Sequence, residues 1–194
     1  MEEQTKQPFS LFDAWYRAAL KLPVTTPSAM ILATASKKGF PSSRIVLLKD
    51  WDESGFVFFT NYQSRKAKEL EANSAASLLF YWEALSKQVR IEGKVKRISV
   101  EQSLQYFQSR PLESQWAAWA SKQSQYLESQ DTLEDRYTSI KEKYPQDVPL
   151  PKFWGGYRLV PSNFEFWEDK DHRLHHRVKF ERVENEWRSH LLFP

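Results

Sequence analysis

The sequence predicts a mainly β protein, an antiparallel barrel with helices inserted after its middle strands. Short apolar runs rich in β-branched and aromatic residues recur between residues 29 and 192, and turn residues bound most of them. The first three runs have connections too short for the crossovers that parallel strands require. No repeat or long linker interrupts the 194 residues, so we expect a single domain, with a short tail at about 1–8.

The first part of the chain predicts two helices that flank three strands. Apolar residues at helical spacing indicate an amphipathic helix capped by Ser10, and Ser64 is placed to cap a shorter one. Because the three intervening runs follow each other closely, we expect them to pair in sequence order as a meander. The predicted elements are a helix at 10–21, strands at 29–36, 43–49 and 56–60, and a helix at 65–71.

The second part predicts further strands around a helical insertion. Alternating apolar residues favour a strand over 88–98, and Ser99 is a good N-cap for the helix that follows it. The Gly155–Gly156 pair is typical of a β-bulge. The remaining predicted elements are strands at 75–82, 153–160, 163–169, 173–182 and 187–192, and helices at 99–110, 112–120 and 132–144.

Composition excludes several classes of protein. The chain has no cysteine, which rules out disulfides, thiolate zinc sites and cysteine nucleophiles. A net charge of +3 is too small to indicate nucleic acid binding by itself. No signal-peptide core is present, and no apolar run approaches the ~18 residues of a membrane span. The histidines within 172–176 do not share one strand face, so we expect no metal site. The lack of cysteine, of a signal-peptide core and of a membrane span leads us to expect a soluble cytoplasmic protein.

The stretch at 44–49 is central to the argument. Four apolar residues between Arg44 and Lys49 predict a strand buried on both faces, in a barrel wall or at a subunit contact. Side-chain alternation places the two cations on opposite faces. Two interpretations stay open: the cations bind anionic ligands such as phosphates, or they lie at strand ends and extend into water.

A second cationic position supports the first interpretation. Arg65 and Lys66 open a helix, where they oppose the helix dipole, and an anion at that point would explain them; a solvated polar turn is the alternative. Other cations, amides and aromatic residues lie at strand ends, helix starts and loops, where ligand sites are usually built. These residues are Gln88, Tyr106, Arg110, Gln123, Trp167, Arg173 and Arg177.

Nine short motifs occur in order along the chain: RIVLLK at 44–49, SRKA at 64–67, QV at 88–89, SRP at 109–111, SKQS at 121–124, VPLP at 148–151, FWGG at 153–156, FW at 166–167 and RLH at 173–175. Together they resemble the pyridoxine/pyridoxamine 5′-phosphate oxidases, flavoenzymes that make pyridoxal 5′-phosphate. The resemblance covers about residues 8–194. It implies a split-barrel FMN-binding fold and a homodimer with FMN at the subunit interface.

The resemblance also implies a set of site residues. FMN contacts would fall on Arg44, Ile45, Val46, Leu47, Leu48, Lys49, Phe59, Thr60, Arg65, Lys66, Gln88, Gln123, Ser124, Trp167 and Arg177. Contacts to the phosphate and ring of the substrate would fall on Lys49, Tyr106, Arg110, Ser114, Arg173 and His175. Of these, Arg173 and His175 are the expected catalytic pair over the reacting carbon.

The implied reaction is the oxidation of pyridoxamine or pyridoxine 5′-phosphate. A hydride passes to FMN, oxygen reoxidises the flavin to give hydrogen peroxide, and the imine formed from the amine hydrolyses to aldehyde and ammonia. The expected partners are this substrate, oxygen and a second copy of the chain, without nucleic acid or membrane.

The sequence departs from the family pattern at several positions. Thr26 stands where an acidic residue is frequent, Phe59 where tyrosine is frequent, and Leu191 where arginine is common. The longer basic N-terminal arm of many members is nearly missing. His176 follows the Arg-Leu-His motif in place of the usual aspartate, which removes a negative charge beside the catalytic pair.

Three other functions fit parts of the sequence. A split-barrel flavin reductase would need no second phosphate site, so Lys49, Tyr106 and Arg110 argue against it. A non-catalytic carrier of pyridoxal phosphate or flavin would bind its ligand without consuming oxygen. A nucleic-acid-binding barrel would need an exposed stacking platform, whereas the aromatic residues here are scattered.

Overall fold

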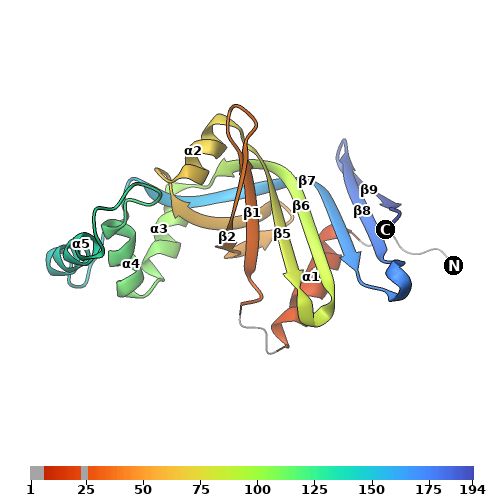
Figure 1. Cartoon of the computed structure of the whole chain (residues 1–194), viewed down its shortest axis with the longest axis horizontal. Coiled ribbons are helices and arrows are strands. Elements are labelled where there is room, and N and C mark those ends of the chain that lie inside the picture. The colour runs from red at the N-terminus through yellow and green to blue at the C-terminus, as the bar shows by residue number, and fades with distance from the viewer. Residues whose placement is uncertain (1–6, 23–25) are drawn as a thin grey trace.

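The structure is a computed structural model that describes residues 7–22 and 26–194. In these residues one antiparallel sheet follows the order β2-β1-β5-β6-β7-β4-β3, and β8 and β9 continue from β7. The sheet curls into a split barrel (Figure 1), which confirms the predicted fold. The strands are β1 (Ala29–Ala35), β2 (Pro41–Leu47), β3 (Asp50–Asp52), β4 (Gly55–Asn61), β5 (Ala75–Trp82), β6 (Lys87–Arg97), β7 (Trp154–Glu168), β8 (His176–Val183) and β9 (Glu186–Leu191).

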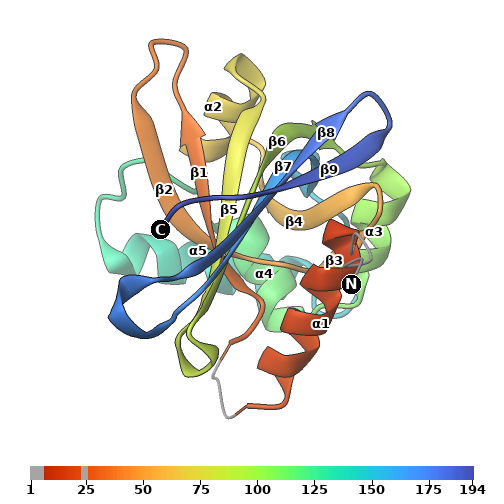
Figure 2. The ribbon, with the colours of Figure 1, turned by 90° about the vertical axis from the view of Figure 1, so that its right-hand side faces the viewer.

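The helices of the described residues lie outside the sheet. They are α1 (Pro8–Leu20), α2 (Arg65–Ala72), α3 (Val100–Gln108), α4 (Leu112–Ala120) and α5 (Gln130–Lys143), with short 3₁₀ turns at Glu83–Leu85 and Asp171–Arg173. Figure 1 shows α3, α4 and α5 gathered at one end of the molecule, away from the β8–β9 hairpin, and Figure 2 shows the molecule from the side of that hairpin. None of them has the length and hydropathy that a bilayer-crossing helix requires, within the ranges given above.

The first hairpin of the predicted meander is confirmed, but the place of its third strand is wrong. β1 pairs with β2 and β5, whereas β4 pairs with β7 and with the short strand β3. Phe56, Val57 and Phe58 of β4 are all buried, so this strand is covered on both of its faces. β7 supplies the hydrogen-bond partners along one edge of β4, and a local sequence pattern does not specify that partner.

β7 joins two predicted strands into one. Its first residues pair with β4 and its last with β8, while β6 runs along the other edge. The expected break lies at Pro161, where the register shifts between Glu92 and Gly93. A bulge there tolerates the missing N–H of proline, and a Cβ on Gly93 would lie 2.0 Å from the Val160 carbonyl oxygen. The bulge is therefore at Gly93 and not at the Gly155–Gly156 pair.

β2 lies at the edge of the sheet, and one of its faces is exposed in the single chain. The prediction of burial on both faces is therefore wrong for one protomer. Ile45 is 70% exposed, and Leu47 and Ile31 of β1 are exposed beside it. Tyr81 on β5, the strand on the other side of β1, is exposed as well. An apolar face therefore runs across β2, β1 and β5, and a face of this kind is typical of an interaction surface.

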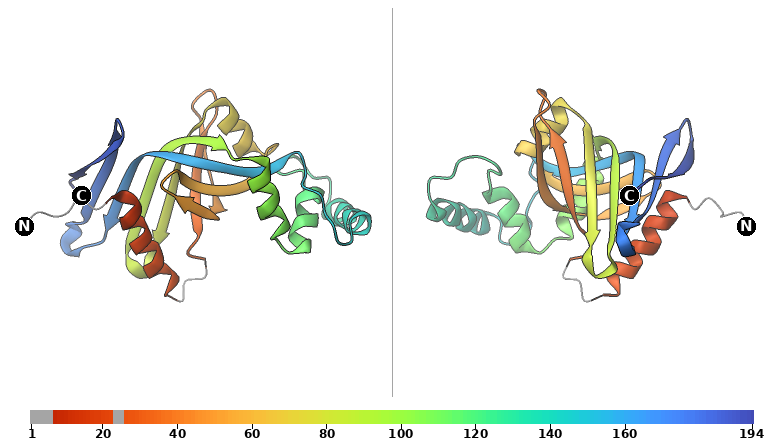
Figure 3. Two further views of the ribbon diagram at one scale, coloured as in Figure 1. Left: turned by 180° about the vertical axis from the view of Figure 1, so that it is seen from behind. Right: turned by 45° about the vertical axis from the view of Figure 1, so that its right-hand side comes forward.

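Helix α1 seals one side of the barrel (Figure 3). Its N-cap is Gln7, with Pro8 in the first turn, so the predicted cap Ser10 lies inside the helix. Proline fits that turn because its missing N–H needs no partner there. Phe12 is fully buried and meets the rings of Phe56 and Phe80 edge-on, with centroids 4.9 and 5.2 Å away.

The other helices begin as predicted or close to it. Ser64 and Ser99 accept hydrogen bonds from the backbone N–H groups three residues later, which confirms both N-caps. Helices α3, α4 and α5 enclose a second small core, separate from that of the barrel. Its buried members are Phe107, Trp116, Val148 and Trp154.

Candidate functional site

A cavity of about 690 Å³ lies between strand β2, strand β4, the start of α2 and the helical insertion. The structure brings much of the predicted site into its lining. The residues that were expected to contact FMN or substrate and that line this cavity are Arg44, Ile45, Val46, Leu47, Lys49, Phe59, Thr60, Lys66, Tyr106, Arg110, Ser114 and Gln123.

Arg44 and Lys49 line the same cavity, and so do Ile45, Val46 and Leu47 between them, so the cavity takes in residues from both faces of β2. β2 ends at Leu47, and the chain then bends so that the Lys49 N–H donates to the Val57 carbonyl of β4 at 2.9 Å. Side-chain alternation holds only while the strand continues. Leu48, at the bend, is buried in the barrel core and does not line the cavity.

Lys66 provides a buried positive charge at one end of the cavity. Its Nζ donates to Gln123 Oε1 at 2.7 Å and to Thr60 Oγ1 at 3.1 Å, both uncharged acceptors. Burial and, second, the charge of Arg44 lower the pKa of Lys66 to about 8. Since Lys66 forms no ion pair within the described ranges, this end of the cavity is suited to an anion.

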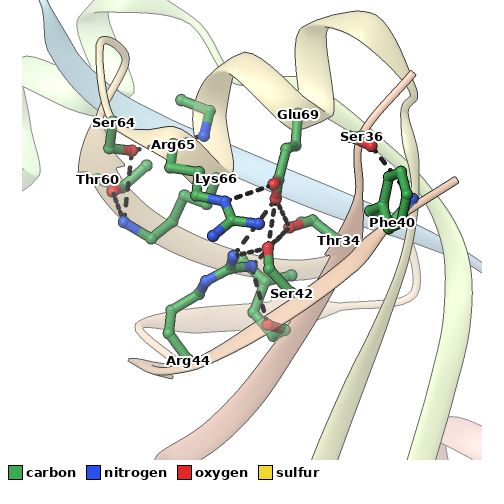
Figure 4. Close-up of polar contacts among 12 residues, drawn as sticks. Thr34, Ser36, Phe40, Ser42, Arg44, Thr60, Ser64, Arg65, Lys66 and Glu69 are labelled. Atoms are coloured by element: carbon green, nitrogen blue, oxygen red, sulfur yellow. Dashed lines mark hydrogen bonds and ion pairs between the residues drawn. The ribbon is translucent and has the colours of Figure 1, made fainter. Parts of the chain in front are cut away.

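Arg44 lies beside Lys66 and is held from behind by a polar network (Figure 4). Its guanidinium donates to the Leu32 carbonyl and to Thr34 and Ser42, and approaches the Glu69 carboxylate at 3.4 Å. Arg65, which forms an ion pair with the same carboxylate at 2.8 Å, lines a neighbouring cleft together with Ser124.

Arg110 provides the positive charge at the other end. Its guanidinium carbon lies 4.8 Å from the centroid of the Trp154 ring, and its Nη1 is buried without a hydrogen-bond partner in the part of the chain that the structure describes. Burial lowers the pKa of Arg110, opposed by the nearby Tyr106. A buried guanidinium N–H without an acceptor is a strong indication of an anionic ligand.

A stack of aromatic rings sets the position of this second end. Tyr106 stacks on Phe59, with ring centroids 3.9 Å apart, and Phe59 stacks on Trp154 at 5.4 Å. The Lys49 ammonium is 5.8 Å from the centroid of the Tyr106 ring. Gly156 leaves room for the stack, because a Cβ at this position would lie 2.9 Å from Phe59 Cε1.

The other predicted site residues form a second group, which lies away from the cavity. Gln88, Trp167 and Arg177 are register partners across β6, β7 and β8. Arg173 and His175 lie in the connection from β7 to β8. Figures 1 and 3 show the β8–β9 hairpin and helices α3–α5 at opposite ends of the molecule.

His175 is oriented by its neighbours within this second group. Its Nδ1 lies 2.8 Å from Asp169 Oδ1, and its ring centroid is 4.8 Å from that of Trp167. Arg177 is held by the buried Glu165 at 2.6 Å. The second group is therefore fixed by its own contacts.

Sequence reasoning did not identify two residues that shape the cavity. The sequence places Trp154 in the FWGG motif without a role at the site, whereas in the structure it lines the cavity and packs against Arg110. Glu69 was missed altogether. The available signal was its position one helical turn after Arg65, but this spacing is equally typical of a surface ion pair.

Comparison with known proteins agrees with this geometry. Residues 16–144 match the family described as pyridoxamine 5′-phosphate oxidase, and residues 154–194 match the pyridoxine 5′-phosphate oxidase C-terminal dimerisation region. A pyridoxine/pyridoxamine 5′-phosphate oxidase of Paraburkholderia phytofirmans is 49% identical over 97% of this chain and 90% of its own length. One of Thermosynechococcus vestitus is 46% identical over 99% and 91%.

Solved structures share the fold of this chain. PhzG of Burkholderia lata, in complex with tetrahydrophenazine-1-carboxylic acid, superposes with a TM-score of 0.94 at 31% identity, over 99% of this chain and 95% of PhzG. An FMN-binding protein of Nostoc punctiforme shares the fold, with a TM-score of 0.78 at 18% identity, over 97% and 98%. In sequence along nearly its full length and in its split-barrel fold, this chain belongs to the pyridoxamine 5′-phosphate oxidase family.

Proposed function

We propose that this protein is an FMN-dependent oxidase that converts pyridoxamine and pyridoxine 5′-phosphate to pyridoxal 5′-phosphate. Oxygen is the electron acceptor, hydrogen peroxide is released, and the amine substrate also yields ammonia. The observation that carries the proposal is the presence of two separate cationic groups in one cavity, Arg44 with Lys66 and Lys49 with Arg110. FMN and the substrate each bring one phosphate, whereas a flavin reductase needs only the first group.

The residues of the cavity fit these ligands. Lys66 has no anionic partner among residues 7–22 and 26–194, and the N-terminus of α2 adds favourable dipole and N–H groups for the FMN phosphate. The orphaned Nη1 of Arg110 fits the phosphate of the substrate. A volume of about 690 Å³ lies in the range usual for sites that take cofactors.

The proposed working unit is a homodimer with FMN at the interface. The match to a dimerisation region at 154–194 and the exposed apolar face with Ile31, Ile45 and Tyr81 support it. The second group of site residues, on β6, β7 and β8, lies away from the cavity of its own chain. In the proposed dimer, Trp167, Arg173 and His175 of each protomer complete the cavity of the other, which gives two identical sites.

FMN would supply the hydride acceptor that no side chain of this protein offers. The chain itself binds both phosphates, orients the substrate ring and excludes water. His175 Nδ1 faces the Asp169 carboxylate at 2.8 Å and the Lys170 backbone N–H at 3.4 Å, so Nε2 is the ring nitrogen placed to hold a proton of the substrate amine or alcohol. Arg173, which is exposed in the single chain, is available to contact the substrate from the partner side.

The test is to incubate the purified protein with FMN and pyridoxamine 5′-phosphate in air and to measure aldehyde and peroxide together. We expect equal amounts of both. Binding without turnover would indicate a carrier, and flavin reduction by a nicotinamide cofactor without aldehyde would indicate a reductase; either result contradicts the proposal. Unphosphorylated pyridoxamine serves as the control substrate, and we expect it to react far more slowly.

A further inference from the structure

The proposed FMN phosphate site has an electrostatic problem of its own. Arg44 from β2 and Arg65 and Lys66 from the first turn of α2 bring three cations together at the positive end of a helix. Burial lowers the pKa of both Arg44 and Lys66, and repulsion acts in the same direction: Arg65 also lowers the pKa of Arg44, and Arg44 also lowers that of Lys66. Without a phosphate, these side chains need some other group to hold them together.

Glu69 is that group. Its side chain is 7% exposed, although it lies on a short surface helix. Oε1 accepts from Arg65 Nε at 2.8 Å, and Oε2 lies 3.4 Å from Arg44 Nη2 (Figure 4). Hydrogen bonds from hydroxyl groups and the charge of Arg65 outweigh the effect of burial and lower the pKa of Glu69 to about 2. The carboxylate therefore stays charged at every pH at which the protein would be studied.

Two hydroxyl groups connect Glu69 to Arg44. Thr34 and Ser42 are register partners on β1 and β2, and each donates to Glu69 Oε2, at 2.5 and 2.6 Å. Each hydroxyl group also accepts a hydrogen bond from the Arg44 guanidinium; the distance from Arg44 Nη1 to Thr34 Oγ1 is 2.6 Å. The directions are fixed because a guanidinium can only donate and a carboxylate can only accept. The network thus locks the guanidinium of Arg44 in two places.

Glu69 does not line the main cavity, so it does not contact a ligand there. Its negative charge close to a phosphate would by itself weaken phosphate binding. Its position is useful to the site only if the ordering of Arg44 and Arg65 outweighs this repulsion. The two effects have opposite signs, so a measurement of affinity separates them.

We infer that Glu69 is a positioning residue of the flavin phosphate site, which orders Arg44 and Arg65 before the ligand arrives and so favours FMN over riboflavin. This inference rests on the proposed function. Pre-organised cations bind better because the ligand does not have to offset the cost of ordering them. The phosphate-free riboflavin gains nothing from that order.

The experiment compares the wild type with Glu69→Gln, Ser42→Ala and the control Glu71→Gln, all as apoprotein. Glu71 lies on the same helix, and its ion pair with Arg97, at 3.5 Å, is exposed. Dissociation constants for FMN and for riboflavin are measured by flavin fluorescence, and the melting temperature of each variant is recorded.

We expect Glu69→Gln to raise the dissociation constant for FMN by about tenfold or more and to leave that for riboflavin unchanged. Ser42→Ala keeps the carboxylate and removes one connection, so we expect a smaller rise for FMN alone. It also carries the test if Glu69→Gln does not fold. Glu71→Gln is expected to match the wild type.

Unchanged or tighter FMN binding in Glu69→Gln would overturn the inference, because repulsion would then dominate. Equal weakening of FMN and riboflavin with a fall in melting temperature would also overturn it, because Glu69 would then only join α2 to the β1–β2 hairpin. If the wild type itself does not prefer FMN to riboflavin, the proposed flavin phosphate site fails, and the inference fails with it.

Discussion

Arg110 offers the sharpest test of the substrate site. Its Nη1 is buried and has no acceptor among the described residues, and its guanidinium lies over Trp154. We expect Arg110→Met to lose the contact to the substrate phosphate while its aliphatic chain keeps packing on the ring. The loss of one charge-assisted hydrogen bond costs roughly 1.5–3 kcal/mol, so kcat/KM is expected to fall about 10- to 150-fold, mainly through KM.

The folded state is expected to tolerate this substitution. No protein acceptor loses its partner at Nη1, and the removal of a desolvated charge offsets the loss of the cation–π contact, which is worth about 0.5–1 kcal/mol. The melting temperature and the affinity for FMN are therefore expected to stay close to those of the wild type.

The assay measures kcat and KM for pyridoxamine 5′-phosphate and for unphosphorylated pyridoxamine. Only the phosphorylated substrate is expected to lose rate, so discrimination between the two falls. Arg158→Met is the matched control, because Arg158 is also buried but pairs with Asp52 at 2.5 Å, outside the cavity. It is expected to lower the melting temperature and to leave KM unchanged. Equal rate losses on both substrates, or loss of flavin, in Arg110→Met would refute the placement of the second phosphate.

Three further outcomes are expected. The apoprotein is expected to bind FMN far more tightly than FAD in a fluorescence titration, because Arg44 and Lys66 face a terminal monophosphate; equal affinities would contradict this. The affinity for FMN is expected to fall as pH rises above about 8, because Lys66, with its lowered pKa, loses its charge there. Lys66→Arg is expected to abolish that fall. A flat wild-type profile from pH 7 to 9 would count against a phosphate contact at Lys66. Gly156→Ala is expected to lower the melting temperature, since its Cβ would lie 2.3 Å from Ile98 Cδ1 and 2.9 Å from Phe59 Cε1, and an unchanged melting curve would show that the aromatic stack tolerates a shift.

The sequence by itself determined features that depend on neighbouring residues along the chain. The bounds of β5 and α4 agree with the predicted ranges 75–82 and 112–120, and the caps Ser64 and Ser99 are confirmed. Strand periodicity and helix capping are settled within a few residues, so they are visible in a single sequence. The motif order was sufficient for the family, because so many short matches in register leave few alternatives.

The tertiary structure alone decided which distant segments meet. β4 pairs with β7, which lies far along the chain, and a local pattern does not specify which strand supplies its hydrogen-bond partners. Arg44 and Lys49 line one cavity because β2 ends at Leu47 and Lys49 then pairs with β4, which a local pattern does not specify. Glu69 shows the same limit: its helical spacing fits a surface ion pair, and only the approach of Thr34 and Ser42 from another part of the sheet makes it a buried counter-charge. Contacts of this kind join residues far apart in sequence, and their energies depend on burial that exists only once the chain has folded.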